Sequence, residues 1–316
     1  SNRVKELTAL GHRFTVVMFG PPNDERRAAL ADHSAGIKAI EVVALFDQWL
    51  EFAVPLKELR RELIQGSDIE IYLLAVRPEV EGWTTHHGMH AELSDEVDWV
   101  LSQADLSGAV DGFVFGIRRD VSPVDGYAAV QQCLAGTNFK ALLHVPCVDM
   151  AWVAESNHEF AEKEELARVA EATLLARANP DLAIVIDNFL ELDRGYCSCR
   201  GLVDRLYNPK DGSRVVTSLN TLLPQQLRKL TSQETTGGRV LSAQCDDGIV
   251  LLIFENSLPA SSEFNDHFPD ETSNKQGRLI NLVTGSEITT NLREVIAKRA
   301  KEKTPQSPVL LLLNDE

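Results

Sequence analysis

The chain has 316 residues, of which 44% are hydrophobic and 25% charged, and its formal net charge is −16. This length predicts about two domains, because a single hydrophobic core stops growing near roughly 250 residues. The acidic excess argues against nucleic acid as a partner, since phosphate binding needs a basic surface. The longest apolar runs, residues 71–76 and 249–254, are far shorter than the roughly 20 residues of a membrane span, so we expect no membrane partner.

The N-terminus and the cysteines bear on location. Residues 1–6 contain no apolar segment of a signal peptide, although Ser1 and Asn2 can be the remnant of a cut, which leaves export from a longer precursor open. Five cysteines without a disulfide-framework spacing fit a reducing compartment. Cys197 and Cys199 are too close together for a standard zinc pair. We therefore predict a cytoplasmic protein and leave its oligomeric state open.

Apolar runs alternate with helical stretches over most of the chain. The first predicted helix spans 3–10. Predicted strands follow at 14–19, 37–45, 69–76, 110–117, 139–145 and 182–186, and further helices at 24–31, 49–64, 94–103, 125–134, 157–178 and 214–229. Pro55 either breaks the helix in which it lies or marks a second start. Such alternation predicts a parallel sheet with right-handed crossovers.

The number of strands leaves two architectures open. A barrel or an open sheet normally begins with a strand, but here a helix comes first, and six strands are two short of a closed (β/α) barrel. We predict an α/β fold with a TIM-type (β/α) barrel that lacks N-terminal strands, in which 37–45 is the fourth strand and 139–145 the seventh. An open doubly wound sheet is the simpler alternative.

The strand–helix alternation ends after residue 196. Residues 231–238 are predicted to be a polar linker, and Asp246-Asp247-Gly248 a hairpin turn between strands at 239–244 and 249–254. Further strands are predicted at 278–282 and 309–313. The predicted domains are therefore a (β/α) barrel over 1–232 and a small antiparallel β-domain over 238–316.

Polar residues lie within or directly after the predicted strands. Glu41 and His144 lie inside two of them. Arg77, Arg118 and Asp187 follow three others. Because the carboxyl ends of parallel strands open onto one crevice, we predict that these five side chains converge on one cleft.

Three of these residues are the predicted catalytic groups, namely Asp187, Glu41 and His144. An ionised Glu41 in a buried strand has a large desolvation penalty unless it reaches a polar lumen or a partner. The structural alternative for Glu41 is an ion pair with Arg77 or Arg118. Asp187 is alternatively a turn cap, and His144 a hydrogen-bonded core histidine.

Substrate contacts are predicted for a further set of residues near the strand ends: Arg77, Trp83, His87, Arg118, Trp152, Asp193 and Arg194. The two tryptophans offer aromatic faces that complement the C–H face of a sugar ring. Arg118 suits a carboxylate or phosphate. Arg194 can orient Asp187 or hold a substrate oxygen, or else form a local ion pair with Asp193.

The sequence predicts neither a metal nor a cofactor. Three histidines lie within residues 86–90, but Gly88 between them indicates a loop rather than a helix that aligns metal ligands. The chain contains no P-loop, no G-x-G-x-x-G turn and no G-x-S-x-G elbow.

The overall plan resembles the glycoside-hydrolase type of (β/α) barrel followed by a small C-terminal β-domain. The carboxylates of Glu41 and Asp187 carry this resemblance, together with residues 277–287, GRLINLVTGSE, and the closing strand PVLLLL. The Asn-Glu pair that ends the fourth strand in the large retaining families is missing, since Val42 follows Glu41.

The resemblance implies a hydrolase that acts on a small-molecule or oligosaccharide substrate with two carboxylates. Two alternatives stay open. One is a catalytically silent carbohydrate-binding or scaffolding protein. The other is a metal-dependent sugar isomerase or epimerase, in which the histidine loop, Glu41 and Asp187 would be ligands.

Overall fold

The computed structural model describes most of the chain, in segments separated by gaps. The described residues are 2–11, 13–45, 49–63, 68–76, 97–98, 101–102, 106–118, 121–146, 158–187, 192–193, 198–199, 201–204, 206–224, 227–235, 238–246, 248–254, 270–299, 301 and 307–314. The chain forms two compact units, one of Ser1–Ile117 with Gly126–His144 and the other of Arg118–Asp125 with Val145–Glu316. The predicted boundary between residues 232 and 238 is not where these units divide, and it stays a prediction.

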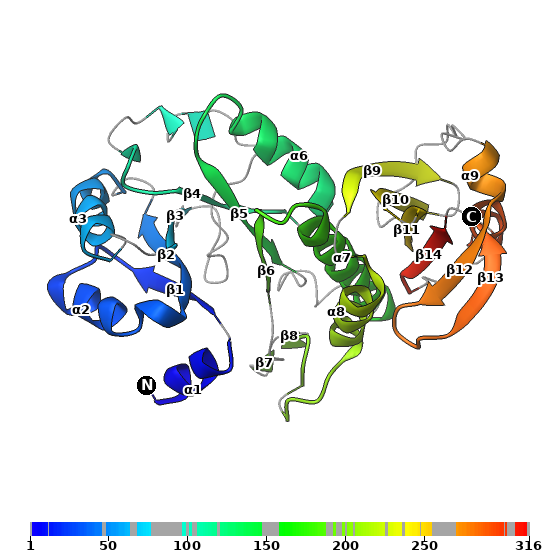
Figure 1. Ribbon diagram of the computed structural model, residues 1–316, viewed down its shortest axis with the longest axis horizontal. Coiled ribbons are helices and arrows are strands. Elements are labelled where there is room, and N and C mark those ends of the chain that lie inside the picture. The colour runs from blue at the N-terminus through cyan, green and yellow to red at the C-terminus, as the bar shows by residue number, and fades with distance from the viewer. Residues whose placement is uncertain are drawn as a thin grey trace. The chain divides into compact units, whose positions relative to one another are not determined.

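Six parallel strands form one sheet in the order β1-β2-β3-β4-β5-β6 (Figure 1). They are β1 Phe14–Phe19, β2 Ile37–Leu45, β3 Glu70–Val76, β4 Gly112–Gly116, β5 Lys140–Pro146 and β6 Ala183–Asp187. The helices of this region are α1 Asn2–Ala9, α2 Asp24–Asp32, α3 Ala53–Leu63, α6 Pro123–Cys133 and α7 His158–Ala178, with short 3-10 turns η1 Ser34–Gly36 and η2 Trp49–Phe52. The predicted strand–helix alternation is confirmed among the described residues, whereas most of the predicted helix over 94–103 lies outside them. Pro55 lies in the first turn of α3, where a proline is tolerated, so it marks the second start.

A second, antiparallel sheet has the order β13-β12-β14-β11-β10-β9. Its strands are β9 Arg228–Thr235, β10 Gly238–Cys245, β11 Gly248–Phe254, β12 Gln276–Asn281, β13 Glu287–Asn291 and β14 Val309–Asn314. Three helices, α8 Asp211–Leu222, α9 Asp270–Asn274 and α10 Leu292–Arg299, belong to the same part of the chain, as does a small pair of strands, β7 Leu192–Asp193 and β8 Ser198–Cys199. The fold is thus a partial (β/α) barrel with a C-terminal antiparallel β-domain, as predicted.

Two sequence predictions at the start of this sheet are wrong. The predicted helix over 214–229 ends at Leu222, because Pro224 favours extended backbone at Leu223, which has φ −74° and ψ 137°. The predicted linker over 231–238 is mostly strand β9, which pairs antiparallel with β10. β9 lies at the edge of the sheet, where polar side chains are tolerated, and its polar sequence therefore looked like a linker.

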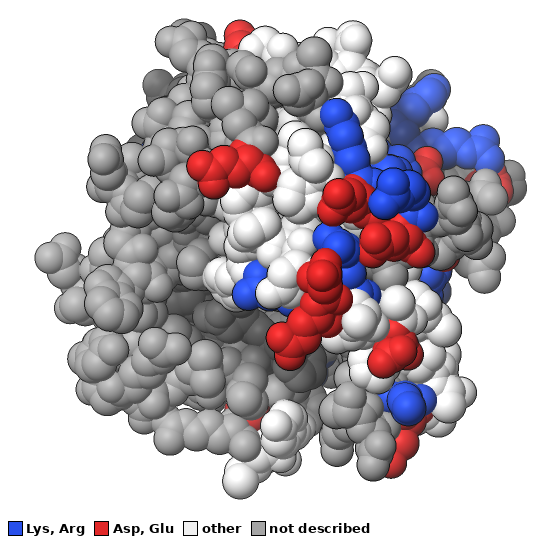
Figure 2. Space-filling view, turned by 90° about the vertical axis from the view of Figure 1, so that its left-hand side faces the viewer, with Lys and Arg blue, Asp and Glu red and all other residues white. Residues whose placement is uncertain are grey.

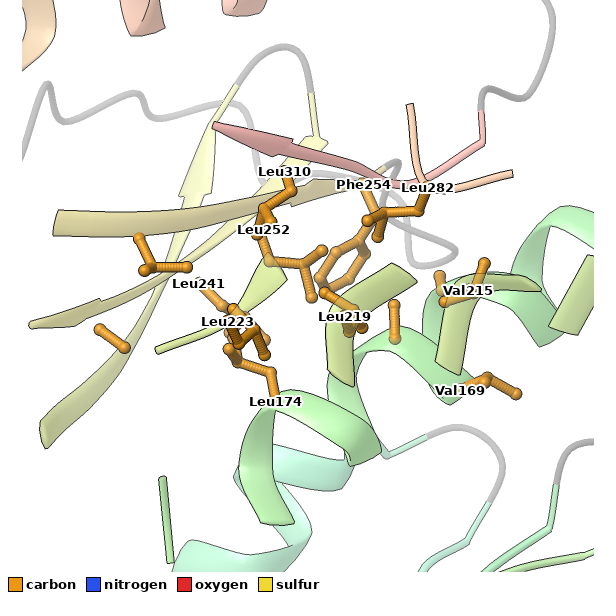
Figure 3. Packing of buried hydrophobic residues seen from close by; sticks show 14 of the residues in the cluster. Val169, Leu174, Val215, Leu219, Leu223, Leu241, Leu252, Phe254, Leu282 and Leu310 are labelled. Atoms are coloured by element: carbon orange, nitrogen blue, oxygen red, sulfur yellow. The ribbon is translucent and has the colours of Figure 1, made fainter. Parts of the chain in front are cut away.

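The antiparallel sheet is buried on two faces. On one face Leu241, Leu252 and Phe254 pack against Leu174 of α7 and Leu219 of α8 (Figure 3). The other face packs against α10, and its buried side chains include Val240, Leu251, Ile253, Leu292 and Val295. Burial on two faces explains why β11 and β14 are nearly continuous apolar runs rather than alternating ones.

The described surface carries charges of both signs. Arg27 of α2 pairs with Asp24 of its own helix and with Glu58 and Glu62 of α3. On the face drawn in Figure 2, the described acidic and basic side chains lie beside one another rather than in separate patches. Within the described residues, no helix combines the length and the apolar character that crossing a membrane requires.

Gly112 of β4 is a position where the barrel sheet requires glycine. A Cβ added there would lie 2.0 Å from the main-chain oxygen of Lys140 on the neighbouring strand. We expect Gly112→Ala to lower the free energy of unfolding by about 1–3 kcal/mol, because the two strands would have to separate. Urea denaturation followed by circular dichroism measures this. A stability equal to the wild type would show that β4 and β5 can move apart freely.

Candidate functional site

Glu41 and His144 form a hydrogen-bonded pair inside the first compact unit. Glu41 lies in the middle of β2 and His144 near the end of β5, and Oε2 of Glu41 is 2.9 Å from Nε2 of His144. The side chain of Glu41 is 2% exposed and that of His144 12% exposed. When the carboxylate is ionised, Nε2 carries a hydrogen and donates a hydrogen bond to Oε2. The structure thus gives Glu41 a histidine as its partner, where the structural alternative was an ion pair with Arg77 or Arg118.

The pair shows that this part of the sheet curls into a barrel wall. The register aligns Glu41 with Tyr72 of β3, Tyr72 with Gly112, and Gly112 with Lys140, which lies four residues before His144. In a flat sheet, the Cα atoms of Glu41 and His144 would be about 19 Å apart, too far for their side chains to meet. Curling brings β2 and β5 to face each other, and the offset along the strands is the stagger that a barrel requires.

A second polar group, Tyr72, Glu70 and Lys140, lies beside Glu41 and towards the amino ends of the strands from His144. Tyr72 is fully buried, and its hydroxyl donates to Oε2 of Glu70 over 3.0 Å. Nζ of Lys140 is 2.5 Å from the other carboxylate oxygen of Glu70. Burial, with the negative charge of Glu70 nearby, raises the pKa of Tyr72, so the phenol stays neutral. By register and side-chain alternation, these three residues share the strand face that carries Glu41.

The second compact unit contains a cluster of buried charges that the sequence reasoning missed. Arg168 and Glu171 of α7 and Arg239 of β10 are each 5% exposed or less. Arg239 Nη2 is 2.9 Å from Asp125 Oδ2, and its Nη1 is 3.5 Å from Glu171 Oε1. The signal available in the sequence was the charge pattern of α7, where Glu165, Arg168 and Glu171 recur every three residues on one face of the helix.

Burial and the neighbouring charges shift the pKa of Glu171 in opposite directions. Burial raises the pKa of its carboxyl, whereas Arg239, the main-chain N–H of Val124, Ser122 and Arg168 lower it. The raised pKa means that burial outweighs the favourable partners. Arg239 and the other partners therefore limit the rise in pKa that burial alone would cause.

The predicted convergence of five side chains is tested only in part. Glu41 and His144 are brought together. Arg118 is exposed at its place after β4. Arg77, Trp83, His87, Trp152 and Arg194 lie outside the described residues, as do the side chains of Asp187 and Asp193, whose main chains end β6 and β7. The roles assigned to all of these residues stay predictions.

In the part of the chain that the structure describes, no three His, Cys, Asp or Glu side chains gather as a metal ion would require. The histidine loop of residues 82–90 lies outside that part.

No protein-family model and no curated protein sequence matches the chain. Among solved structures, a GH39 β-xylosidase from Caulobacter crescentus is similar over 92% of this chain and 71% of its own, with 11% identity and a TM-score of 0.39. A β-glucuronidase 2 of Bacteroides uniformis is similar over 88% and 37%, with 11% identity and a TM-score of 0.41. An α-glucosyl transfer enzyme, XgtA, is similar over 92% and 68%, with 10% identity and a TM-score of 0.39. The assignment of the fold itself rests on the strands and their register.

Proposed function

We propose that this protein is a carbohydrate-active hydrolase. In this proposal His144 transfers a proton, Glu41 orients the imidazole of His144, and Asp187 is the carboxylate that assists at the sugar carbon. Glycoside hydrolysis requires a group that gives a proton to the leaving oxygen and an anionic group that assists at the sugar carbon. A partial (β/α) barrel presents such groups at the carboxyl ends of its strands. The substrate would be a small sugar or an oligosaccharide.

The observation that carries this proposal is the hydrogen bond between Glu41 and His144. A carboxylate that accepts from one ring nitrogen fixes the orientation of the imidazole and determines which ring nitrogen carries the hydrogen. This arrangement is a familiar device for holding a proton-transferring histidine. Because Glu41 is almost fully buried, we assign it to positioning His144 rather than to contact with a substrate.

The same burial favours a second candidate, a catalytically silent carbohydrate-binding protein. If the Glu41–His144 pair only satisfies two polar groups inside the barrel, the protein can bind sugar without cleaving it. A test of turnover and a test of binding on the same variants separate the two functions.

The deciding variant is Asp187→Asn, assayed on a panel of chromogenic aryl glycosides. We expect turnover to fall about a hundredfold or more, the size of effect typical when one preorganised electrostatic group is lost. We expect the melting temperature to stay unchanged, since Asn retains the shape of Asp and caps turns about as well. Binding of the same sugars, measured by calorimetry, shows whether recognition survives.

Asp204→Asn is the matched control. Asp204 Oδ1 accepts from the main-chain N–H groups of Leu206 and Asn208, so its role is to cap a loop. We expect this variant to keep full turnover. If no glycoside is cleaved by the wild type while a sugar still binds, the silent alternative replaces the hydrolase. Full turnover in Asp187→Asn would remove Asp187 from the site.

A further inference from the structure

Arg168 of α7 donates to three main-chain oxygens at once, although it is only 5% exposed. Its Nε donates to the oxygen of Pro146 over 3.1 Å, its Nη1 to that of Val121 over 2.8 Å and its Nη2 to that of Arg118 over 3.3 Å. A planar guanidinium with a fixed fork of N–H groups can hold several acceptors in one geometry. Arg168 therefore joins two separate chain segments through their backbones.

The two segments are the continuations of β4 and β5. Pro146 is the last residue of β5 and lies two residues after His144. Arg118 follows Ile117, whose N–H donates to the oxygen of His144 over 2.9 Å. The main chain of His144 is thus bonded to the end of β4, and both strands continue into oxygens that Arg168 holds.

Glu171, one turn further along α7, accepts a hydrogen bond from the first turn of α6, which follows the segment that Arg168 holds. Its Oε1 accepts from the N–H of Val124 over 2.9 Å. Arg168 therefore binds the segment after β4 to α7 through the oxygens of Arg118 and Val121, and Glu171 binds the first turn of α6 to the same helix through the N–H of Val124. The two side chains also attract each other, since Arg168 lowers the pKa of Glu171.

We propose that Arg168 is the positioning residue for His144, because it fixes the ends of β4 and β5 around the histidine and so keeps the ring in register with Glu41. This inference rests on the proposed role of the Glu41–His144 pair. A displacement of about 1 Å breaks such a hydrogen bond or misplaces a catalytic group, so a rigid strand end is needed.

The test observes the histidine directly, by NMR of the protein labelled with ¹⁵N only in histidine. The imidazole signals of His144 are assigned by their loss in His144→Gln. We expect Arg168→Gln to shift these signals towards those of a solvent-exposed histidine. We also expect tryptic cleavage after Arg118 and Arg119 to rise about tenfold or more, because each hydrogen bond from a charged group is worth roughly that factor in local opening.

Arg177→Gln is the control, since Arg177 lies on the same helix and donates to one main-chain oxygen, that of Leu223. It should change neither readout. Arg168→Lys keeps the charge but not the fork, so it should give intermediate shifts, and it carries the test if Arg168→Gln does not fold. Unchanged His144 signals in a folded Arg168 variant, or equal changes in Arg177→Gln, would overturn the proposal. Both readouts are independent of turnover, so a protein that cleaves no sugar would refute the proposed hydrolase without refuting the role of Arg168.

Discussion

Replacing Arg239 by methionine is expected to lower the free energy of unfolding by about 3–5 kcal/mol, as when one partner of a buried ion pair is removed. The side chain of Arg239 is 4% exposed and lies between Asp125 and Glu171. Its Nε also donates to Oγ of Ser232 over 2.6 Å. Methionine replaces much of the apolar stem, so the loss reports on charge rather than on a cavity. Guanidinium unfolding followed by circular dichroism measures the difference.

The loss should depend on pH in a direction set by Glu171. Burial raises the pKa of Glu171 above its ordinary value of 4.5, and removing Arg239 raises it further. A carboxyl with a raised folded-state pKa contributes stability below its unfolded pKa, and this contribution is lost as the pH rises through the folded pKa. The deficit of Arg239→Met relative to the wild type should therefore be largest near neutral pH and shrink as the pH falls towards 4.5.

Two further variants sharpen this experiment. Adding Glu171→Gln should recover part of the stability and remove the pH dependence, because Gln can still accept from Val124 but carries no charge. Arg278→Gln is the control, since Arg278 pairs with Glu287 on the same sheet but is 50% exposed. It should change stability by no more than about 1 kcal/mol. Equal losses in Arg239→Met and Arg278→Gln would show that burial of the charge is unimportant.

Replacing Glu41 by leucine is expected to abolish turnover and to lower the free energy of unfolding by about 1–3 kcal/mol. The structural loss arises because Nε2 of His144 is left without its partner in a largely buried position. The functional loss arises because the imidazole loses the carboxylate that orients it. Chemical denaturation and the aryl glycoside assay on the same preparation measure both effects.

The double variant Glu41→Leu/His144→Leu separates function from structure. Replacing both partners of a buried polar pair by apolar side chains is often neutral or stabilising. We therefore expect the free energy of unfolding of the double variant to be at least as high as that of Glu41→Leu alone. The double variant should show no turnover. Such a result means that the barrel keeps the pair at the expense of stability, as expected of a functional site. Turnover retained in either variant would remove the pair from the proposed mechanism.

The sequence by itself determined the strands and several candidate residues. The bounds of β1 and β2 match the predicted ranges, because apolar β-branched runs bounded by polar turns leave few alternatives. Glu41 and His144 were visible as polar residues within apolar strands, where an unpaired charge would be too unfavourable to persist. Strands β11 and β14 were equally visible as apolar runs, since their sheet is buried on both faces.

Only the tertiary structure decided which groups meet. The partner of Glu41 is a histidine three strands away rather than a nearby arginine, because contacts across a barrel follow from curvature and stagger, which no local pattern encodes. β9 looked like a linker because an edge strand needs few apolar side chains, and only its pairing with β10 identifies it as a strand. The burial of Arg168, Glu171 and Arg239 was not predicted, because it comes from segments that are distant in the sequence and pack around them only when the chain is folded.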